Sequence, residues 1–472
     1  MPTLEESMSS ALQRRAQKSS LRSLALPTHT ASSTPLVDFS SNDFLSLSTS
    51  PLLHTEYLSL LEAHLDPHTS KSSSTPPTLG STGSRLLTGN SSLALTLEHD
   101  IAKFHNAPAG LLFNSGFDAN SAFFSCVPQS GDVIVFDQEI HASVHEGMRT
   151  SRAEKRIAFT HNDVGSLRSV LEALLAEEDS KGEAKRNVFV AVESLYSMDG
   201  DICQLGSIVE AVEDVLGLGG EGRHGRGYII IDEAHSTGIY GEQGRGLVCE
   251  LGLEKKIFAR LHTFGKALAA NGAIILTTPL VCHYLLNYAR PLIYSTSLST
   301  PSLLLIKASY SILSSPSISS LSKQLHSLSR YLHILLSNLP SSSYITYHNQ
   351  DAPSPIFSIQ TPYPKELAKE CQDQGFNVRG IMSPTVKRGT ERVRVCLHAG
   401  NTRYEVEGLV RVIQEWIVDM EKKEHTGAIT SRQFIQNSPR KSTGDGVLEL
   451  RSEQPGILAR SFGSGLIKRA KL

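Results

Sequence analysis

The chain has 472 residues, of which 40% are hydrophobic and 19% are charged, so a large buried core is available. Its net charge is -2, which argues against a general nucleic-acid-binding protein, and no apolar run approaches the roughly 18 residues of a membrane span. Six scattered cysteines without a CxxC pair, and an N-terminus without an apolar signal stretch, predict a soluble intracellular protein with buried thiols.

Residues 1–50 are an N-terminal segment in which Leu4, Met8 and Leu12 have helical spacing. Between residues 51 and 298, helical segments alternate with the short apolar runs AGLLFNSG, GDVIVFD, NVFVAVES, GYIIIDEA and NGAIILTT. The cores VIVF and YIII are apolar at every position, as strands buried on both faces must be. This alternation predicts a large α/β domain around a mostly parallel sheet.

Residues 299–420 predict a smaller α+β domain. Leucines recur every three to four residues from Leu321 to Leu339, and a core-facing helix is favoured over a coiled-coil seam because the run spans only about three heptads. SPIFSIQT, FNVRGI and RVRVCL are predicted strands, and the helix ELAKECQDQG should stop at Gly375. Thr402 and Glu405 have the spacing of a capping box that starts a helix reaching Met420, and residues 421–472 are predicted to form a flexible tail.

Two sequence patterns resemble ligand-binding motifs but do not indicate a binding site. GLGGEG formally fits the dinucleotide pattern G-x-G-x-x-G, but a helix-like segment precedes it and a strand follows, which reverses the required order. We interpret it as a loop insertion. His141 and His145 lie four residues apart, as zinc-binding histidines on a helix do, but no Glu or Cys completes such a site, so no metal is expected.

Asp232 and Lys266 are more informative. Asp232 ends the run YIII, so its carboxylate is expected at the C-terminal edge of a buried strand, where open α/β sheets bind ligands. An isolated strand-end acid is more often a helix cap or a loop residue. Lys266 lies among small residues in HTFGKALAANGA, and a desolvated lysine has a lowered pKa and can form a Schiff base. An acid that keeps a pyridine nitrogen protonated, together with such a lysine, predicts pyridoxal 5'-phosphate (PLP) as the cofactor.

An ordered set of motifs extends from Arg22 to about residue 420. Its members include FSSNDFL, GSTGSRLLTGN, LLFNSGFDAN, HASVHEG, SMDGD, DEAHSTGIYGEQGRG, TFGKAL, LIYSTSL and TERVRV. In these motifs the chain resembles the α-oxoamine synthases, PLP-dependent transferases of fold type I (aspartate aminotransferase-like), and within that family the 8-amino-7-oxononanoate synthase group. The resemblance implies a homodimer with shared active sites that uses acyl-CoA and L-amino acid substrates.

The resemblance also implies a role for each matching residue. The catalytic residues would be Lys266, which carries the cofactor, Asp232 at the ring nitrogen and His141, which stacks on the ring. The cofactor phosphate would be held by Ser115, Gly116, Phe117 and Thr263, and Thr296 would reach the phosphate of the partner subunit. Ser197 and His235 would donate to the phenolic oxygen of the ring. The substrate side would comprise Arg22, Asn42, Thr385 and Arg394.

Arg394 would bind the amino-acid carboxylate with a bidentate fork that lysine cannot supply. The alternative for RVRV is an edge strand with solvated arginines. Two positions depart from the family pattern: Met382 stands where an arginine is frequent, and Asn401 stands where a histidine is frequent. They affect the expected acyl-chain or amino-acid preference more than catalysis.

The resemblance implies decarboxylative condensation of L-alanine with pimeloyl-CoA, or its carrier-protein thioester, to 8-amino-7-oxononanoate, CO2 and free thiol, a step of biotin synthesis. The alternatives are another amino acid or acyl chain within the family, including 5-aminolevulinate, sphingoid-base or secondary-metabolite types, or a catalytically silent homologue that acts as a subunit.

Ala470-Lys471-Leu472 resembles the peroxisomal address Ser-Lys-Leu. It predicts binding to the import receptor and a peroxisomal location, with the cytoplasm as the alternative.

Overall fold

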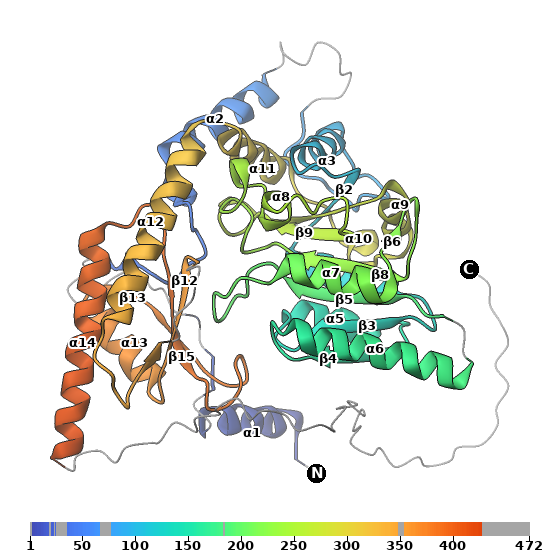
Figure 1. The fold of residues 1–472 in the computed structure, drawn as a ribbon. Helices are drawn as coiled ribbons and strands as arrows, with labels where there is room; N and C mark the ends of the chain where they lie inside the picture. Colours follow the sequence, from blue (N-terminus) through green and yellow to red (C-terminus); the bar gives the residue numbers. More distant parts are fainter. Residues whose placement is uncertain are drawn as a thin grey trace.

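The computed structural model describes residues 2–17, 20–22, 24, 35–66, 77–182, 185–347 and 354–426. These residues form a large lobe around a seven-stranded sheet and a smaller lobe around a four-stranded antiparallel sheet (Figure 1). The C-terminal tripeptide Ala470-Lys471-Leu472 and most of the predicted tail lie outside the described residues. In the described part of the chain, no helix is both long and apolar enough to cross a membrane.

The sheet of the large lobe runs in the order β2-β10-β9-β8-β5-β3-β4. Its strands are β2 (Ala109–Phe113), β3 (Val133–Asp137), β4 (Lys155–Phe159), β5 (Val188–Glu193), β8 (Gly227–Asp232), β9 (Ala259–Thr263) and β10 (Ala273–Thr277). β10 is antiparallel to both of its neighbours, and the other neighbouring strands are parallel. The prediction of an α/β domain with a mostly parallel sheet is therefore confirmed.

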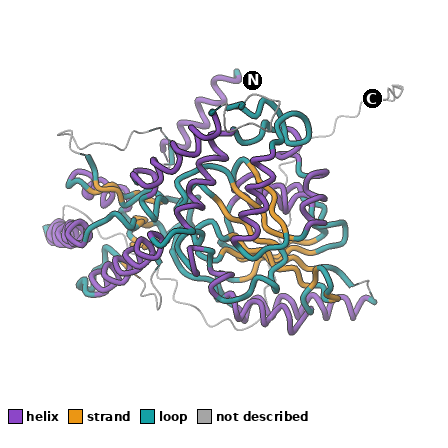
Figure 2. The backbone as a smooth tube through the Cα atoms, turned by 90° about the horizontal axis from the view of Figure 1, so that it is seen from above, coloured by secondary structure: helices purple, strands orange, loops and turns teal. Residues whose placement is uncertain are grey.

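Helices cover both faces of this sheet (Figure 2), which explains why the strands are apolar at successive positions. One face packs against α4 (Gly116–Cys126), α5 (Ala142–Thr150), α9 (Pro279–Tyr288) and α10 (Arg290–Tyr294). The opposite face packs against α3 (Ser92–Phe104), α6 (Val164–Lys181), α7 (Leu205–Leu216), α8 (Leu247–Glu250) and α11 (Thr300–Leu313). Within β8, Ile230 faces the first group, whereas Ile229 and Ile231 face the second.

The small lobe contains the sheet β11-β12-β15-β14. Its elements are β11 (Thr346–Tyr347), β12 (Ile356–Gln360), β14 (Arg379–Ile381), β15 (Arg392–Cys396), α12 (Ser317–Ser337), α13 (Pro364–Asp373) and α14 (Arg403–His425). Leu325, Leu328 and Leu332 of α12 are buried in the core, so the core-facing helix is confirmed. The capping box of Thr402 and Glu405 is present and starts α14, which continues beyond the predicted end at Met420.

The N-terminal segment joins the small lobe to the large one. β1 (Val37–Asp38) pairs in parallel with β13 (Phe376–Asn377), and after the 3-10 helix η1 (Leu47–Thr49), α2 (Pro51–Leu65) packs against α11. α1 (Leu4–Gln17) is exposed along its whole length. The segment GLGGEG falls on a hairpin of β6 (Gly219–Gly220) and β7 (Arg223–His224) between α7 and β8, which agrees with a loop insertion. The short η2 (Glu242–Gly244) follows β8.

Candidate active site

A cavity opens at the carboxyl ends of β5 and β8. The last residues of these strands, Glu193 and Asp232, are register partners and both line the cavity. Side chains alternate along a strand, so Asp232 lies on the same face as Ile230, the face that α4 and α5 cover. The carboxyl edge of the parallel sheet therefore brings two acids together with the N-terminal ends of two helices, as expected for a ligand site of an α/β protein.

Asp232 is held by two donors. It is 8% exposed, its Oδ2 accepts a hydrogen bond from the side-chain amide of Asn120 at 2.7 Å, and its Oδ1 accepts from the backbone N–H of Ala234 at 2.9 Å. Asn120 also donates to Ser143 Oγ at 3.0 Å, and Ser143 Oγ lies 2.7 Å from Nδ1 of His141. Asp232 and His141 thus belong to one hydrogen-bonded chain, which restricts the orientation of the acid.

The turn Ser115-Gly116-Phe117 forms another wall of the cavity. Ser115 is the N-cap of α4, and its Oγ accepts from the backbone N–H of Asp118 at 3.0 Å. A Cβ on Gly116 would lie 2.5 Å from Cγ2 of Thr263, so only glycine permits this close approach. The Thr263 Oγ1 is buried and has no hydrogen-bond partner among the described residues. A hydroxyl left unpaired beside a helix N-terminus fits a bound anion.

Lys266 lies in the connection between β9 and β10 and lines the same cavity as Asp232. Burial lowers the pKa of its amine, and the positive charge of Arg394 adds to this, whereas Asp232 and Glu193 oppose the shift. No ion pair in the described part of the chain includes this amine. The predicted meeting of the lysine with the strand-end acid is therefore seen in the structure.

His141 and His235 complete the inner wall. His141 caps α5, and its Nδ1 accepts from the backbone N–H of Ser143 at 3.2 Å. Burial lowers the pKa of both histidines, strongly so for His235, where the charge of Lys266 acts in the same direction. Both rings are therefore expected to be neutral near pH 7.

Arg394 is a buried cation of the small lobe. It lies on β15, which is flanked on both sides by other strands, so the alternative of an edge strand with solvated arginines is wrong. Its Nε donates to the carbonyl of Ser197 at 2.6 Å, and one Nη donates to Oδ1 of Asn42 at 3.0 Å. Arg392, on the same face of the strand, pairs with Asp199. Arg394 has no carboxylate partner among the described residues, which favours an anionic ligand here.

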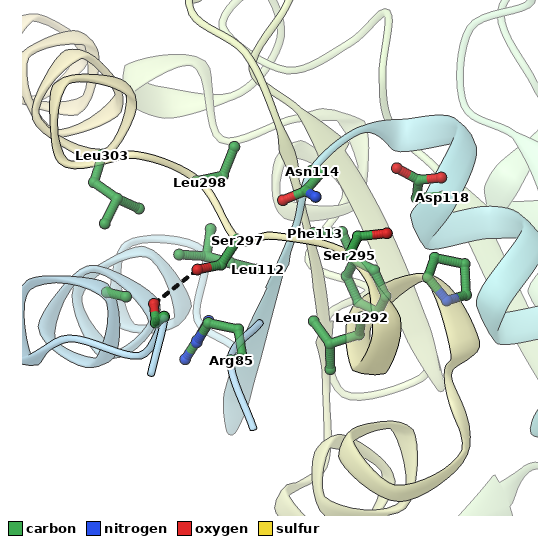
Figure 3. Close-up of a pocket in the computed structure, with 13 residues that line it drawn as sticks. Arg85, Leu112, Phe113, Asn114, Asp118, Leu292, Ser295, Ser297, Leu298 and Leu303 are labelled. Carbon is green, nitrogen blue, oxygen red and sulfur yellow. Dashed lines mark hydrogen bonds between the residues drawn. The ribbon is translucent and has the colours of Figure 1, made fainter. Parts of the chain in front are cut away.

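Besides Ser197 and Arg394, three predicted site residues do not line this cavity. Thr296 is exposed, and its carbonyl accepts from the side chain of Asn114 at 2.8 Å. It lies beside the small cavity of Figure 3, which Arg85, Asn114 and Ser295 help to line and in which Ser297 Oγ donates to the carbonyl of Gly89. Arg22 and Thr385 are also exposed. Their roles stay predictions, as does that of Ser197, whose backbone carbonyl holds Arg394.

The comparisons with known proteins identify the family. A sequence model of aminotransferase class I and II matches residues 34–413. The 8-amino-7-oxononanoate synthase of Emericella nidulans is 48% identical over 423 residues, covering 89% of this chain and 97% of that protein. The aminoacyl transferase sphA of Aspergillus fumigatus is 34% identical, covering 83% and 84%. The chain belongs to the α-oxoamine synthase family.

Solved structures confirm fold type I for this α-oxoamine synthase. The serine palmitoyltransferase of Sphingomonas wittichii superposes with a TM-score of 0.73 at 22% identity, covering 91% of this chain and 100% of that one. The 8-amino-7-oxononanoate synthase of Francisella tularensis superposes with a TM-score of 0.63 at 24% identity, covering 82% and 99%.

The protein is a PLP-dependent acyltransferase, and its residues fit that cofactor. The turn at Gly116 and the unpaired hydroxyl of Thr263 would hold the phosphate, and Asp232 would face the ring nitrogen. Sequence reasoning missed Glu193 and Asn120. Glu193 ends the run NVFVAVE just as Asp232 ends YIIID, so the strand-end rule applied to Asp232 could have found it. Nothing in the sequence marks Asn120, on helix α4, as a donor to a residue at the end of β8.

Proposed function

We propose that this α-oxoamine synthase condenses L-alanine with a pimeloyl thioester, with loss of CO2, to form 8-amino-7-oxononanoate and free thiol. The observation that carries the proposal is the cavity in which the depressed-pKa amine of Lys266 and the doubly hydrogen-bonded carboxylate of Asp232 meet. The 48% identity to the Emericella nidulans enzyme over most of both chains supports the choice of substrates.

When bound, PLP supplies an electron-withdrawing ring that stabilises negative charge at the Cα of the amino acid. Asp232 would sustain this property by facing the ring nitrogen. Burial lowers the pKa of Lys266, which favours the neutral amine that takes the Cα proton and later returns one. Arg394 binds the amino-acid carboxylate, since its guanidinium is oriented by Ser197 and Asn42 and lacks a carboxylate of the protein.

A second candidate is a related reaction with serine and a long acyl chain. It is favoured by the 34% identity to the aminoacyl transferase sphA and by the fold shared with serine palmitoyltransferase. Measuring thiol release by the PLP-loaded protein with alanine, glycine or serine, each with pimeloyl-CoA or palmitoyl-CoA, separates the candidates. Release that is fastest with alanine and pimeloyl-CoA is expected, with 8-amino-7-oxononanoate identified by mass. Fastest release with serine and palmitoyl-CoA would replace the first proposal with the second.

A Lys266→Ala variant tests the catalytic assignment. Its thiol release should fall to background, and borohydride treatment should no longer fix the cofactor on the peptide that contains position 266. Lys256→Ala is the matched control, because Lys256 pairs with Glu213 on the surface away from the cavity. Normal release by the Lys266→Ala protein would refute the assignment.

We further propose that the enzyme is a homodimer with shared sites. Large apolar side chains that lie within two residues, in sequence, of the lining of the small cavity of Figure 3 are exposed, among them Leu87 at 81%, Tyr294 at 74% and Phe117 at 48%. Patches of this kind mark interaction surfaces. Thr296 lies in the same region and is exposed, as a contact to a second copy requires. Light scattering should show a dimer that Leu87→Glu weakens and that Leu251→Glu, at another exposed leucine, leaves intact. A wild-type monomer would overturn this proposal.

A further inference from the structure

The cavity contains a second buried carboxyl group that the reaction described above does not use. Glu193 is 2% exposed and is the register partner of Asp232 on the neighbouring strand. Register partners of a parallel pair point to the same side of the sheet, so the two carboxyl groups face the same space. Two adjacent carboxyl groups in a buried site resist simultaneous ionisation.

The two acids have unequal hydrogen-bond donors. Asp232 accepts from a side-chain amide and a backbone N–H, so a donor already faces each of its two oxygens. Glu193 receives a backbone N–H from His141, and its Oε1 is buried without a partner in the described part of the chain. If only one of the two acids is protonated, the proton is therefore expected on Glu193.

The charged groups around Glu193 agree with this assignment. Burial and then the neighbouring charge of Asp232 raise the pKa of Glu193 well above its usual range, and Asp137 on β3 adds to the increase. Two groups lower the pKa of Glu193 without reversing the increase: Lys266, in the β9–β10 connection, and the backbone N–H of His141, just before α5.

His235 supplies an acceptor for that proton. Its Nδ1 is buried without a hydrogen-bond partner among the described residues and lies 3.9 Å from Oε2 of Glu193. This distance is about 1 Å longer than a hydrogen bond, a gap that a small side-chain rotation closes. A neutral imidazole carries a proton on one nitrogen only. An O–H of Glu193 that donates to Nδ1 leaves the proton of His235 on Nε2.

We propose that Glu193 is a neutral carboxylic acid that donates to Nδ1 of His235 and so holds His235 as the Nε2–H tautomer, a hydrogen-bond donor toward the bound cofactor. Glu193 is then a positioning residue that acts through His235. An ionised Glu193 would instead accept from an Nδ1–H, and Nε2 would become an acceptor that repels an anionic oxygen of the ligand. The inference rests on the PLP site, and its effect on the rate of thiol release rests on the proposed function.

Glu193→Gln and Glu193→Ala distinguish the two states. Glutamine is neutral and keeps an N–H donor, so the pH titration of the absorbance of bound PLP should match that of the wild type, and thiol release should stay within about threefold. Alanine removes the donor and leaves Nδ1 unpaired, so the titration should shift and thiol release should fall about tenfold or more. A Glu193→Gln protein whose titration shifts as much as that of Glu193→Ala would overturn the proposal.

Infrared spectroscopy tests the protonation state without substrates. The protein at neutral pH should show the carbonyl band of a protonated carboxylic acid, lost in Glu193→Gln and retained in Glu213→Gln, which changes an exposed acid. Absence of this band in the wild type would refute the inference even if Glu193→Ala failed to fold. Thiol release by the wild type separately reports the proposed function, so the two failures are distinguishable.

Discussion

The close approach of Gly116 to Thr263 makes a sharp prediction about the cofactor cavity. A Cβ at position 116 would lie 2.5 Å from Thr263 Cγ2, well inside the contact distance of two carbons, so the Thr263 side chain, β9 or the N-terminus of α4 must move. Overpacking of this kind costs about 1–3 kcal/mol. Gly116→Ala should lower the free energy of unfolding of the apoprotein by about that amount. It should also weaken PLP binding, because the displaced atoms belong to the expected phosphate site.

The same contact identifies a compensating change. Thr263→Ser removes Cγ2 and keeps the hydroxyl, at a cost of about 0.8 kcal/mol for the lost methyl group. If the clash is the cause, Gly116→Ala in the Thr263→Ser background should cost much less than it does in the wild type. The coupling energy should exceed about 1 kcal/mol, as found for residues in direct contact.

Urea unfolding of the four apoproteins, followed by PLP titration, measures both effects. Gly206→Ala is the matched control, because Gly206 also lies in the first turn of a helix but has open space around its Cβ position. That variant should be as stable as the wild type or gain up to about 1 kcal/mol. Equal costs of Gly116→Ala in the wild-type and Thr263→Ser backgrounds would refute the reasoning.

Three further predictions follow from other parts of the structure. Arg394→Lys should raise KM for the amino acid about tenfold or more and leave PLP affinity unchanged, because lysine cannot keep both hydrogen bonds that orient Arg394. Steady-state kinetics measures this effect, with Arg411→Lys on α14 as the control. Burial, with Arg260, lowers the pKa of His105 to about 3, so its stabilising contribution is present above pH 6.5 and is lost as the pH falls. Between pH 7 and pH 5 the free energy of unfolding should fall by about 2 kcal/mol because of His105. In the His105→Gln variant, the free energy of unfolding should decrease by about 2 kcal/mol less over the same pH range. Deleting Ala470 to Leu472 should leave activity intact and make a tagged protein cytosolic; unchanged punctate staining would contradict the predicted address.

Much of the fold follows from local patterns in the sequence. The apolar runs ending at Asp137 and Asp232 became buried strands, and the Thr402 capping box starts the last helix. β9 escaped prediction because Arg260 and His262 interrupt its apolar pattern. Both side chains are buried: Arg260 donates to the carbonyl of His105, and His262 lies 3.4 Å from Glu233. The partner at position 105 is remote in sequence, so local periodicity cannot reveal that these polar residues are accommodated in a core strand.

In the active site, too, some residues could be predicted from their local sequence, whereas the importance of others depends on which strands are neighbours. Asp232 and Lys266 could be predicted because each has an unusual local setting, the end of an apolar run and a stretch of small residues. Glu193 has the same local setting as Asp232, but its importance depends on β5 lying beside β8 in a register that pairs the two acids. Strand order and register depend on the packing of the whole sheet. A single carboxylate can face a ring nitrogen, whereas the adjacent pair, with two donors to Asp232 and one to Glu193, becomes a site in which one acid keeps its proton.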